Sequence, residues 1–197
     1  MGLRERNAAM TRRAIYLAAM ELFTANGYDD TTMEEIAQRA DIGSSTLYRY
    51  FANKESIVLE PFGEPGVMAA ELARHPADEE VAVLVGHAVL ALIKHADAGF
   101  AVDPRLDEML KKNLKPATHL LAWYRDDERL LEEALYERTG ASASDLTIAF
   151  TAKLAGVLLD LTMRARETAD EPLSPVETAR QIMRQLRGNP PTMPQIP

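Results

Sequence analysis

The sequence predicts an all-α protein, and three observations lead to this fold class. Apolar residues recur at helical spacing along most of the 197-residue chain. No stretch of useful length alternates apolar and polar residues as a half-buried strand does. Capping sequences, glycines and prolines separate the apolar stripes. We expect about nine helices, arranged as an N-terminal three-helix helix-turn-helix domain and a C-terminal antiparallel helical bundle.

The first expected helix ends at Gly27, because glycine can adopt the left-handed conformation of a C-terminal cap. Its apolar residues recur at the i, i+4, i+8 spacing that places side chains on one face, which should pack against a core. These residues are Ala14, Ile15, Ala18, Ala19, Leu22 and Phe23.

Shorter helices should follow Gly27. Thr32 to Glu35 has the Thr-x-x-Glu form of a capping box, which indicates the start of a helix. A tight turn at 41–43 separates that helix from another over about 44–51, and Asn53 is placed to cap a further helix. Pro61 should end this last helix, because proline removes a backbone donor and clashes with the preceding turn.

The rest of the chain predicts a bundle of longer helices. Ser174, Pro175 and Glu177 mark the start of the final one, since a capping serine precedes proline at the first helical position. The proline-rich tail at 188–197 should be disordered. We therefore divide the chain into a helix-turn-helix domain at 1–60, a helical domain at 61–187 and the tail. The bundle helices are expected over about 65–74, 78–97, 103–113, 117–138, 144–167 and 174–187.

Composition limits the possible functions. The absence of cysteine excludes disulfides, thiolate metal sites and cysteine nucleophiles. No export signal is visible, and the apolar run at 81–93 is too short to span a bilayer, so we expect a cytoplasmic protein without membrane contact. The net charge of -8 lies entirely after residue 54, because residues 1–54 hold seven basic and seven acidic groups. Only this N-terminal region should tolerate a polyanion.

A helix-turn-helix suits duplex DNA, because a helix fits the major groove while hydroxyls and cations contact phosphates. Ser44, Ser45 and Arg49 are the candidates for base contacts, since serine can donate or accept and arginine can pair with guanine. The tyrosines of this segment could instead be half-buried packing residues. The candidates for phosphate contacts are Thr46, Tyr48, Tyr50 and Lys54.

The segments Thr31 to Ala37, Ala40 to Phe51 and Lys54-Glu55, together with Leu22-Phe23 and Gly27-Tyr28, resemble the DNA-binding domain of TetR/AcrR-type repressors over residues 11–58. The resemblance implies the same base and phosphate contacts, and it adds a contact between Thr31 or Thr32 and the DNA backbone.

Two positions depart from the family pattern. Asp41 replaces the usual glycine of the turn, and Gly43 replaces the usual hydroxyl cap of the recognition helix. Asp tolerates the left-handed conformation, and glycine is an acceptable N-cap, so we expect the turn to be kept.

The resemblance also implies that the domain at 61–187 binds a small effector and forms a homodimer through its last two helices. The effector candidates are large or polarisable residues: Met68, His87, Met109, His119, Trp123, Tyr124 and Phe150. The dimer candidates are Ala152, Gly156, Leu161, Ile182, Met183 and Leu186. Both sets could instead complete the core of the single chain.

We considered an enzyme and a helical protein-binding adaptor as alternatives. No phosphate loop, HExxH motif or nucleophile elbow occurs, and the acidic run at 126–128 is explained by a solvated helix surface. His87 and His95 are spaced to share a helix face, but no third ligand follows at metal spacing, so we expect no metal and no cofactor. The sequence favours a homodimeric, ligand-responsive DNA-binding regulator, a repressor of a palindromic operator.

Overall fold

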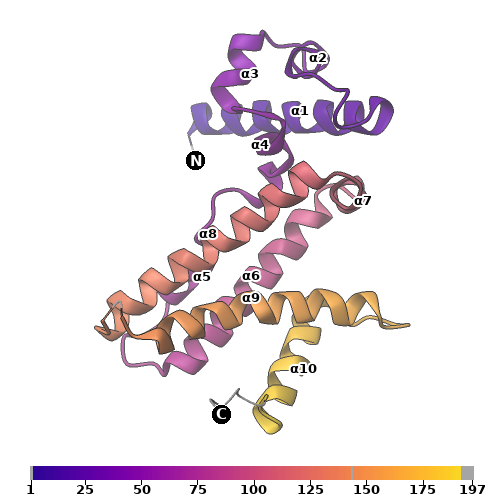
Figure 1. The fold of residues 1–197 in the computed structure, drawn as a ribbon. Helices are drawn as coiled ribbons and strands as arrows, with labels where there is room; N and C mark the ends of the chain where they lie inside the picture. Colours follow the sequence, from indigo (N-terminus) through magenta and orange to yellow (C-terminus); the bar gives the residue numbers. More distant parts are fainter. Residues whose placement is uncertain (1, 143, 192–197) are drawn as a thin grey trace. The chain divides into compact units, whose positions relative to one another are not determined.

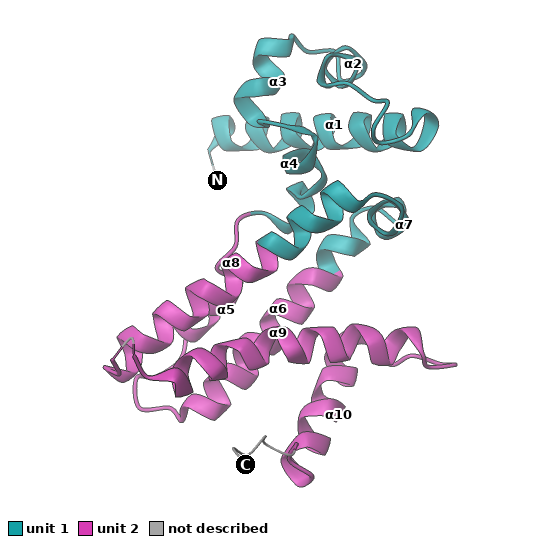
Figure 2. Cartoon of the chain, in the orientation of Figure 1, with its two compact units in different colours: residues 1–63, 98–122 teal, residues 64–97, 123–197 magenta. Residues whose placement is uncertain are grey.

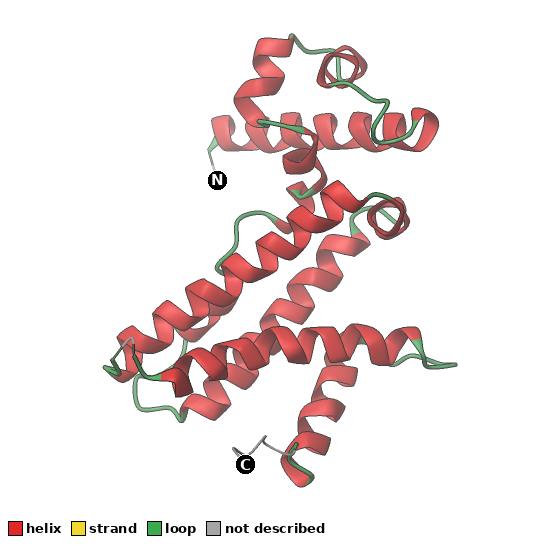
Figure 3. Ribbon diagram, viewed as in Figure 1, coloured by secondary structure: helices red, strands yellow, loops and turns green. Residues whose placement is uncertain are grey.

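The computed structural model describes residues 2–142 and 144–191, and within them it contains ten α-helices and one 3₁₀ helix (Figure 1). No strand occurs in this part of the chain (Figure 3). The all-α prediction is therefore confirmed, and the ten α-helices agree with the expectation of about nine. The predicted disordered tail falls partly outside the described residues, at 192–197, and its first residue, Gly188, belongs to the last helix.

The helices form two compact units (Figure 2). The first unit comprises the chain up to Gly63 together with residues 98–122, and the second comprises residues 64–97 and the chain from Trp123 onward. The chain first passes from one unit to the other after Gly63, close to the expected domain boundary at 60/61. The return of residues 98–122 to the first unit was not expected.

The first unit begins with a long helix, α1 (Leu3–Asn26), and three short ones, α2 (Met33–Arg39), α3 (Ser44–Tyr50) and α4 (Lys54–Val58). It also contains the 3₁₀ helix η1 (Glu60–Phe62) and α7 (Arg105–Lys112). As expected, α4 ends before Pro61, which lies in η1.

The buried face of α1 is wider than the predicted stripe. Tyr16 and Met20 are buried in addition to Ile15 and Phe23, whereas Ala14 is exposed. The reason is that α1 contacts several helices of its unit, namely α2, α4 and α7. A helix with neighbours on more than one side buries more than a single stripe.

Gly99 allows close packing beside η1. A Cβ atom at Gly99 would lie 2.7 Å from two ring carbons of Phe62, which is nearer than side chains approach one another. Phe62 is completely buried and packs edge-on against Phe100, with ring centroids 5.2 Å apart. The glycine therefore makes room for the Phe62 ring in the segment that follows α4.

The second unit contains α5 (Val67–Leu72), α9 (Leu146–Glu167), α10 (Pro175–Gly188) and most of α6 (Val81–Ala101) and α8 (Leu114–Thr139). Leu84 and Leu92 of α6 and Leu131 and Leu135 of α8 are at most 1% exposed. Helix α10 packs against α9. The core of this unit is mostly aliphatic, as the helical spacing predicted.

Asp127 holds the start of α5. Its side chain is completely buried on α8, and Oδ1 accepts hydrogen bonds from the backbone amides of Gly66 (2.5 Å) and Val67 (2.6 Å). The amide of Met68 donates to Oδ2 at 3.3 Å. The prediction that residues 126–128 form a solvated surface is therefore wrong for Asp127, which satisfies helix-terminal donors that would otherwise lack partners.

Helices α6 and α9 are each long and apolar enough to cross a membrane by length and composition alone. Helix α6 extends well beyond the apolar run that we judged too short. Core helices of soluble proteins meet the same criterion. The two helices differ in burial, because 39% of the apolar window is buried in α6 and 22% in α9. Several apolar side chains of α9, among them Leu146, Phe150 and Val157, are accordingly exposed in the single chain.

Candidate functional site

Helix α2 begins with the predicted capping box. Thr32 Oγ1 accepts a hydrogen bond from the Glu35 amide at 3.2 Å, and the Thr32 amide donates to Glu35 Oε2 at 2.7 Å. The bond from the Thr32 amide is the main cause that lowers the pKa of the Glu35 carboxyl. This reciprocal pair fixes where α2 begins.

The turn between α2 and α3 is made by a non-glycine residue in the left-handed conformation. Asp41 has φ 54°, and the Ile42 amide donates to the Ala37 carbonyl at 3.0 Å. The turn is therefore kept despite the departure from the family pattern, as expected. Gly43 caps α3 with an extended backbone and no side-chain hydrogen bond.

Helix α3 has one buried and one exposed face. Leu47 is completely buried and anchors the helix to the unit. The three predicted base-contacting residues, Ser44, Ser45 and Arg49, are all exposed, and the Arg49 guanidinium lies 5.4 Å from the centre of the Tyr50 ring. Thr46 and Tyr50 are partly buried. The exposed face of α3 thus consists of two serine hydroxyls, one cation and the ring of Tyr48.

Tyr48 connects α3 to α2 and remains accessible. Its ring is 49% exposed, and its hydroxyl donates to Glu34 Oε1 at 3.2 Å. Desolvation, followed by the charge of Glu34, raises the pKa of Tyr48. Half of this side chain therefore remains accessible, a position that suits the predicted phosphate contact and the half-buried packing alternative equally.

The side chains of Thr31 and Lys54, both predicted to contact DNA, make hydrogen bonds within the chain. Thr31 is 1% exposed, and its hydroxyl donates to the Gly27 carbonyl at 2.8 Å. Of the two candidates for a contact from the start of α2, Thr32 is the accessible one. Lys54 Nζ donates to the carbonyls of Tyr28, Asp29 and Thr31 at 2.6, 3.3 and 2.7 Å. Lys54 thus holds the α1–α2 loop through its ammonium group. Its contact with a phosphate remains a prediction.

Arg12 was missed by the sequence analysis, although it supports the end of α3. Its Nε donates to both carboxylate oxygens of Glu60 at 2.8 Å, and Nη1 donates to the Tyr50 carbonyl at 3.4 Å. The guanidinium also lies 4.6 Å from the centre of the Phe51 ring. Because 48 residues separate Arg12 from Glu60, local spacing gave no signal for this contact.

The predicted effector residues do not form one set. Met109 and His119 belong to the first unit, and the others belong to the second. Met68 and Trp123 are buried. The Trp123 ring stacks on that of His95 with centroids 5.8 Å apart, and it meets the Tyr124 ring edge-on with centroids 5.4 Å apart. Burial is the main cause that raises the pKa of Tyr124. Phe150 is 49% exposed on α9 and lies on an open surface.

Helices α6 and α10 of the second unit line a shallow cavity of about 340 Å³ that is widely open to solvent. Val83, Leu90 and Met183 give it apolar walls, and Arg180 and Arg184 contribute two cations. Gly86 and His87 complete the lining. Of the predicted effector residues, His87 alone lines this cavity, and Met183 had been predicted for the dimer instead.

The predicted dimer residues differ in accessibility. Ala152 is completely buried within the single chain, so a partner could not contact it, and the prediction is corrected for this residue. At Gly156, a Cβ atom would lie 3.0 Å from Glu128 Oε2, so this glycine serves packing against α8. Small residues on α9 allow close approach inside the chain. Leu161, Ile182, Met183 and Leu186 are partly exposed.

The chain is similar to known DNA-binding regulators. Residues 15–60 match the family model described as "Bacterial regulatory proteins, tetR family". The HTH-type transcriptional regulator TcmR of Streptomyces glaucescens is 30% identical over 152 residues, covering 73% of this chain and 67% of that protein. The HTH-type transcriptional regulator UidR of Escherichia coli is 27% identical over 166 residues, covering 79% of each chain.

A solved structure is similar to this chain in fold and in sequence. It is that of Thermus thermophilus FadR, a TetR family transcriptional repressor in complex with lauroyl-CoA. The TM-score is 0.50 and the sequence identity 25%, and the match covers 94% of this chain and 98% of FadR. The similarity therefore extends over both units and is not confined to the helix-turn-helix.

Proposed function

The chain belongs to the TetR family of bacterial regulatory proteins, and from this premise we propose that it is a cytoplasmic repressor that binds a palindromic operator as a homodimer. A small effector with a largely apolar body releases it from DNA. The observation that carries the proposal is the exposed polar face of α3, where Ser44, Ser45 and Arg49 are accessible on a helix anchored by buried Leu47.

The α3 face suits base edges in the major groove. Serine hydroxyls can donate or accept, and the Arg49 guanidinium can pair with O6 and N7 of guanine. Thr32, Thr46, Tyr48 and Tyr50 flank this face and supply hydroxyls for phosphates. A single short helix contacts few bases, so two copies related by two-fold symmetry are needed for useful specificity.

The dimer interface is proposed on α9, with Ile182 and Leu186 of α10 at its edge. Leu146, Phe150, Leu154 and Val157 are 78%, 49%, 37% and 49% exposed, and their spacing places them on one face. A contiguous apolar face of this kind is a mark of a protein interface. Phe150, first predicted to contact the effector, belongs to this face in the proposal.

The effector is proposed to occupy the cavity between α6 and α10. Its apolar walls and its two arginines suit a molecule with an apolar body and an anionic group. The lauroyl-CoA ligand of Thermus thermophilus FadR combines these two features. Lauroyl-CoA is therefore a suitable first probe for this chain.

Selection of bound duplexes from a random DNA pool tests the DNA-binding proposal. We expect enrichment of a palindrome whose half-sites lie about 34 Å apart, or one helical turn, because each copy places one α3 in the groove. Light scattering should give twice the mass of the chain. An enriched site without two-fold symmetry, or a monomeric mass in the DNA complex, would contradict the homodimer.

Release from the selected duplex tests the effector proposal. Lauroyl-CoA should release the protein, whereas CoA without the acyl chain should not. Arg180→Ala should raise the required lauroyl-CoA concentration about tenfold, because a charge-assisted hydrogen bond is lost. Arg187→Ala removes an exposed cation of the same helix that does not line the cavity, and it should leave release unchanged. Equal effects of both variants would place the effector elsewhere.

A further inference from the structure

We propose that His75, Glu79 and His87 form a binding site for one divalent transition-metal ion of the zinc type. Each residue offers one ligand atom, and these three atoms all lie within 4.8 Å of one another. Two imidazole nitrogens and one carboxylate oxygen are a donor set that suits Zn²⁺ and similar ions. The site lies within the second unit and does not depend on the proposed DNA contacts.

His75 occupies the centre of the cluster. Its Nδ1 atom lies 2.8 Å from Glu79 Oε2, and its ring stacks on that of His87 with centroids 4.5 Å apart. Neighbouring ligand atoms around a tetrahedral Zn²⁺ lie about 3.3 Å apart, given zinc–ligand bonds of about 2.0 Å. The two ring planes differ by 27°, so one imidazole must turn out of the stack before both can bind one ion, and the exposed His87 is the ring that can do so.

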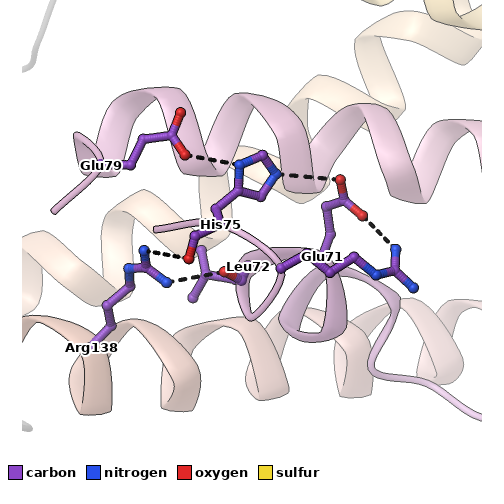
Figure 4. Close-up of polar contacts among 6 residues, drawn as sticks. Glu71, Leu72, His75, Glu79 and Arg138 are labelled. Atoms are coloured by element: carbon purple, nitrogen blue, oxygen red, sulfur yellow. Dashed lines mark hydrogen bonds and ion pairs between the residues drawn. The ribbon is translucent and has the colours of Figure 1, made fainter. Parts of the chain in front are cut away.

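A second carboxylate faces the other side of the His75 ring. Glu71 Oε1 lies 3.5 Å from His75 Nε2, and Arg74 donates to Glu71 Oε2 at 2.6 Å (Figure 4). A carboxylate on one imidazole nitrogen fixes the tautomer and the ring orientation in metal sites, and leaves the other nitrogen free to bind the ion. Without an ion the closer carboxylate is that of Glu79, which accepts the proton of His75 Nδ1, so Zn²⁺ must displace this proton, and Glu71 is then placed to accept a proton from Nε2.

Arg138 of α8 holds the backbone that carries His75. It donates to the carbonyls of Leu72 and His75 at 3.0 and 3.2 Å (Figure 4). It also donates to the carbonyl of Pro76. A metal site needs ligands whose positions are fixed before the ion arrives. The turn after α5 meets this requirement, while exposed His87 leaves the ion a path from solvent.

A calorimetric titration tests the proposal, in which ZnCl₂ is added to the chelator-treated protein. We expect one Zn²⁺ per chain and an affinity at or below about 10 µM. His87→Ala and Glu79→Gln should each weaken Zn²⁺ binding at least tenfold. Because His87 is exposed and Gln has the shape of Glu, both variants should fold. His119→Ala removes an exposed histidine of the first unit and should bind Zn²⁺ like the wild type.

Two further measurements distinguish a specific metal site from nonspecific binding of Zn²⁺. Zn²⁺ should raise the Tm of the wild type but not that of His87→Ala, because an ion that binds the folded state stabilises it. Mg²⁺ should not compete with Zn²⁺, since it prefers oxygen ligands. The proposal is overturned by no binding up to roughly 100 µM Zn²⁺, by unchanged affinity in both variants, or by equally tight Mg²⁺ binding.

Discussion

Helices α3 and α9 each present an exposed face, and the two faces differ in chemistry. Helix α3 buries Leu47 and exposes Ser44 and Arg49, whereas α9 buries Ala152 and exposes Phe150 and Leu146. Their buried faces are both mainly apolar and would not distinguish the two helices. The exposed faces do, because hydroxyls and a cation suit a hydrated polyanion, while uncovered aliphatic and aromatic side chains suit another apolar surface.

The largest effect should come from placing a charge on the α9 face. If the proposed dimer forms through α9, Leu154→Glu should weaken it by about 3 kcal/mol or more, because the variant carboxylate would be buried without a partner in each copy. Light scattering should then report the monomer, and operator binding should be lost with it. Leu121→Glu changes a 63% exposed leucine of the first unit and should leave the mass unchanged. An intact dimer in Leu154→Glu would remove α9 from the interface.

The exposed face of α3 is tested by Arg49→Ala. Loss of one base-pairing guanidinium should cost about 2 kcal/mol of binding to the preferred operator and relax the preference at one base position. Binding of the variant to a shuffled duplex should change little. Arg125→Ala, which removes an exposed cation of the second unit, is the control. Equal losses on both duplexes would identify Arg49 as a phosphate contact.

A substitution of Lys54 tests whether this residue supports the fold or contacts DNA. If it holds the α1–α2 loop, Lys54→Met should reduce the free energy of unfolding by about 1.5 kcal/mol, because three carbonyls lose a charged donor. The salt dependence of DNA binding should then be unchanged. Lys115→Met removes an exposed cation of the same unit and should have little effect on stability. A salt slope reduced by roughly 1 in Lys54→Met would instead establish the phosphate contact.

The smallest effect concerns the turn that positions α3. Asp41→Ala should reduce the free energy of unfolding by about 0.5 kcal/mol, because alanine tolerates positive φ less well than Asp. Asp41→Gly should be at least as stable as the wild type, since glycine has no Cβ penalty there. Urea unfolding measures both. A stable Asp41→Ala would mean that the turn does not require the left-handed conformation in solution.

Much of the first unit could be predicted because its signals are local. The capping box of α2, the turn at Asp41 and the end of α4 before Pro61 each depend on a few consecutive residues. The family resemblance rested on the same segments and is confirmed by its relatives. A DNA-binding regulator, in place of an enzyme, follows from that membership.

Contacts between distant residues could not be predicted in this way. His75 and Glu79 precede α6, and only the fold brings them to His87. The effector residues were chosen by size and polarisability, which do not tell a core position such as Met68 from a surface one such as Phe150. Ala152 was misassigned because small residues permit close packing inside a chain as well as between chains.

The contact between Arg12 and Glu60 matters for the construction of chimeric regulators. The family model begins at residue 15, and a DNA-binding head exchanged at that border would leave Arg12 behind while carrying Glu60 along. The transplanted segment would lose the group that joins η1 to the end of α3. A functional exchange should therefore include the whole of α1 from Leu3, so that the recognition helix keeps the support with which it folds.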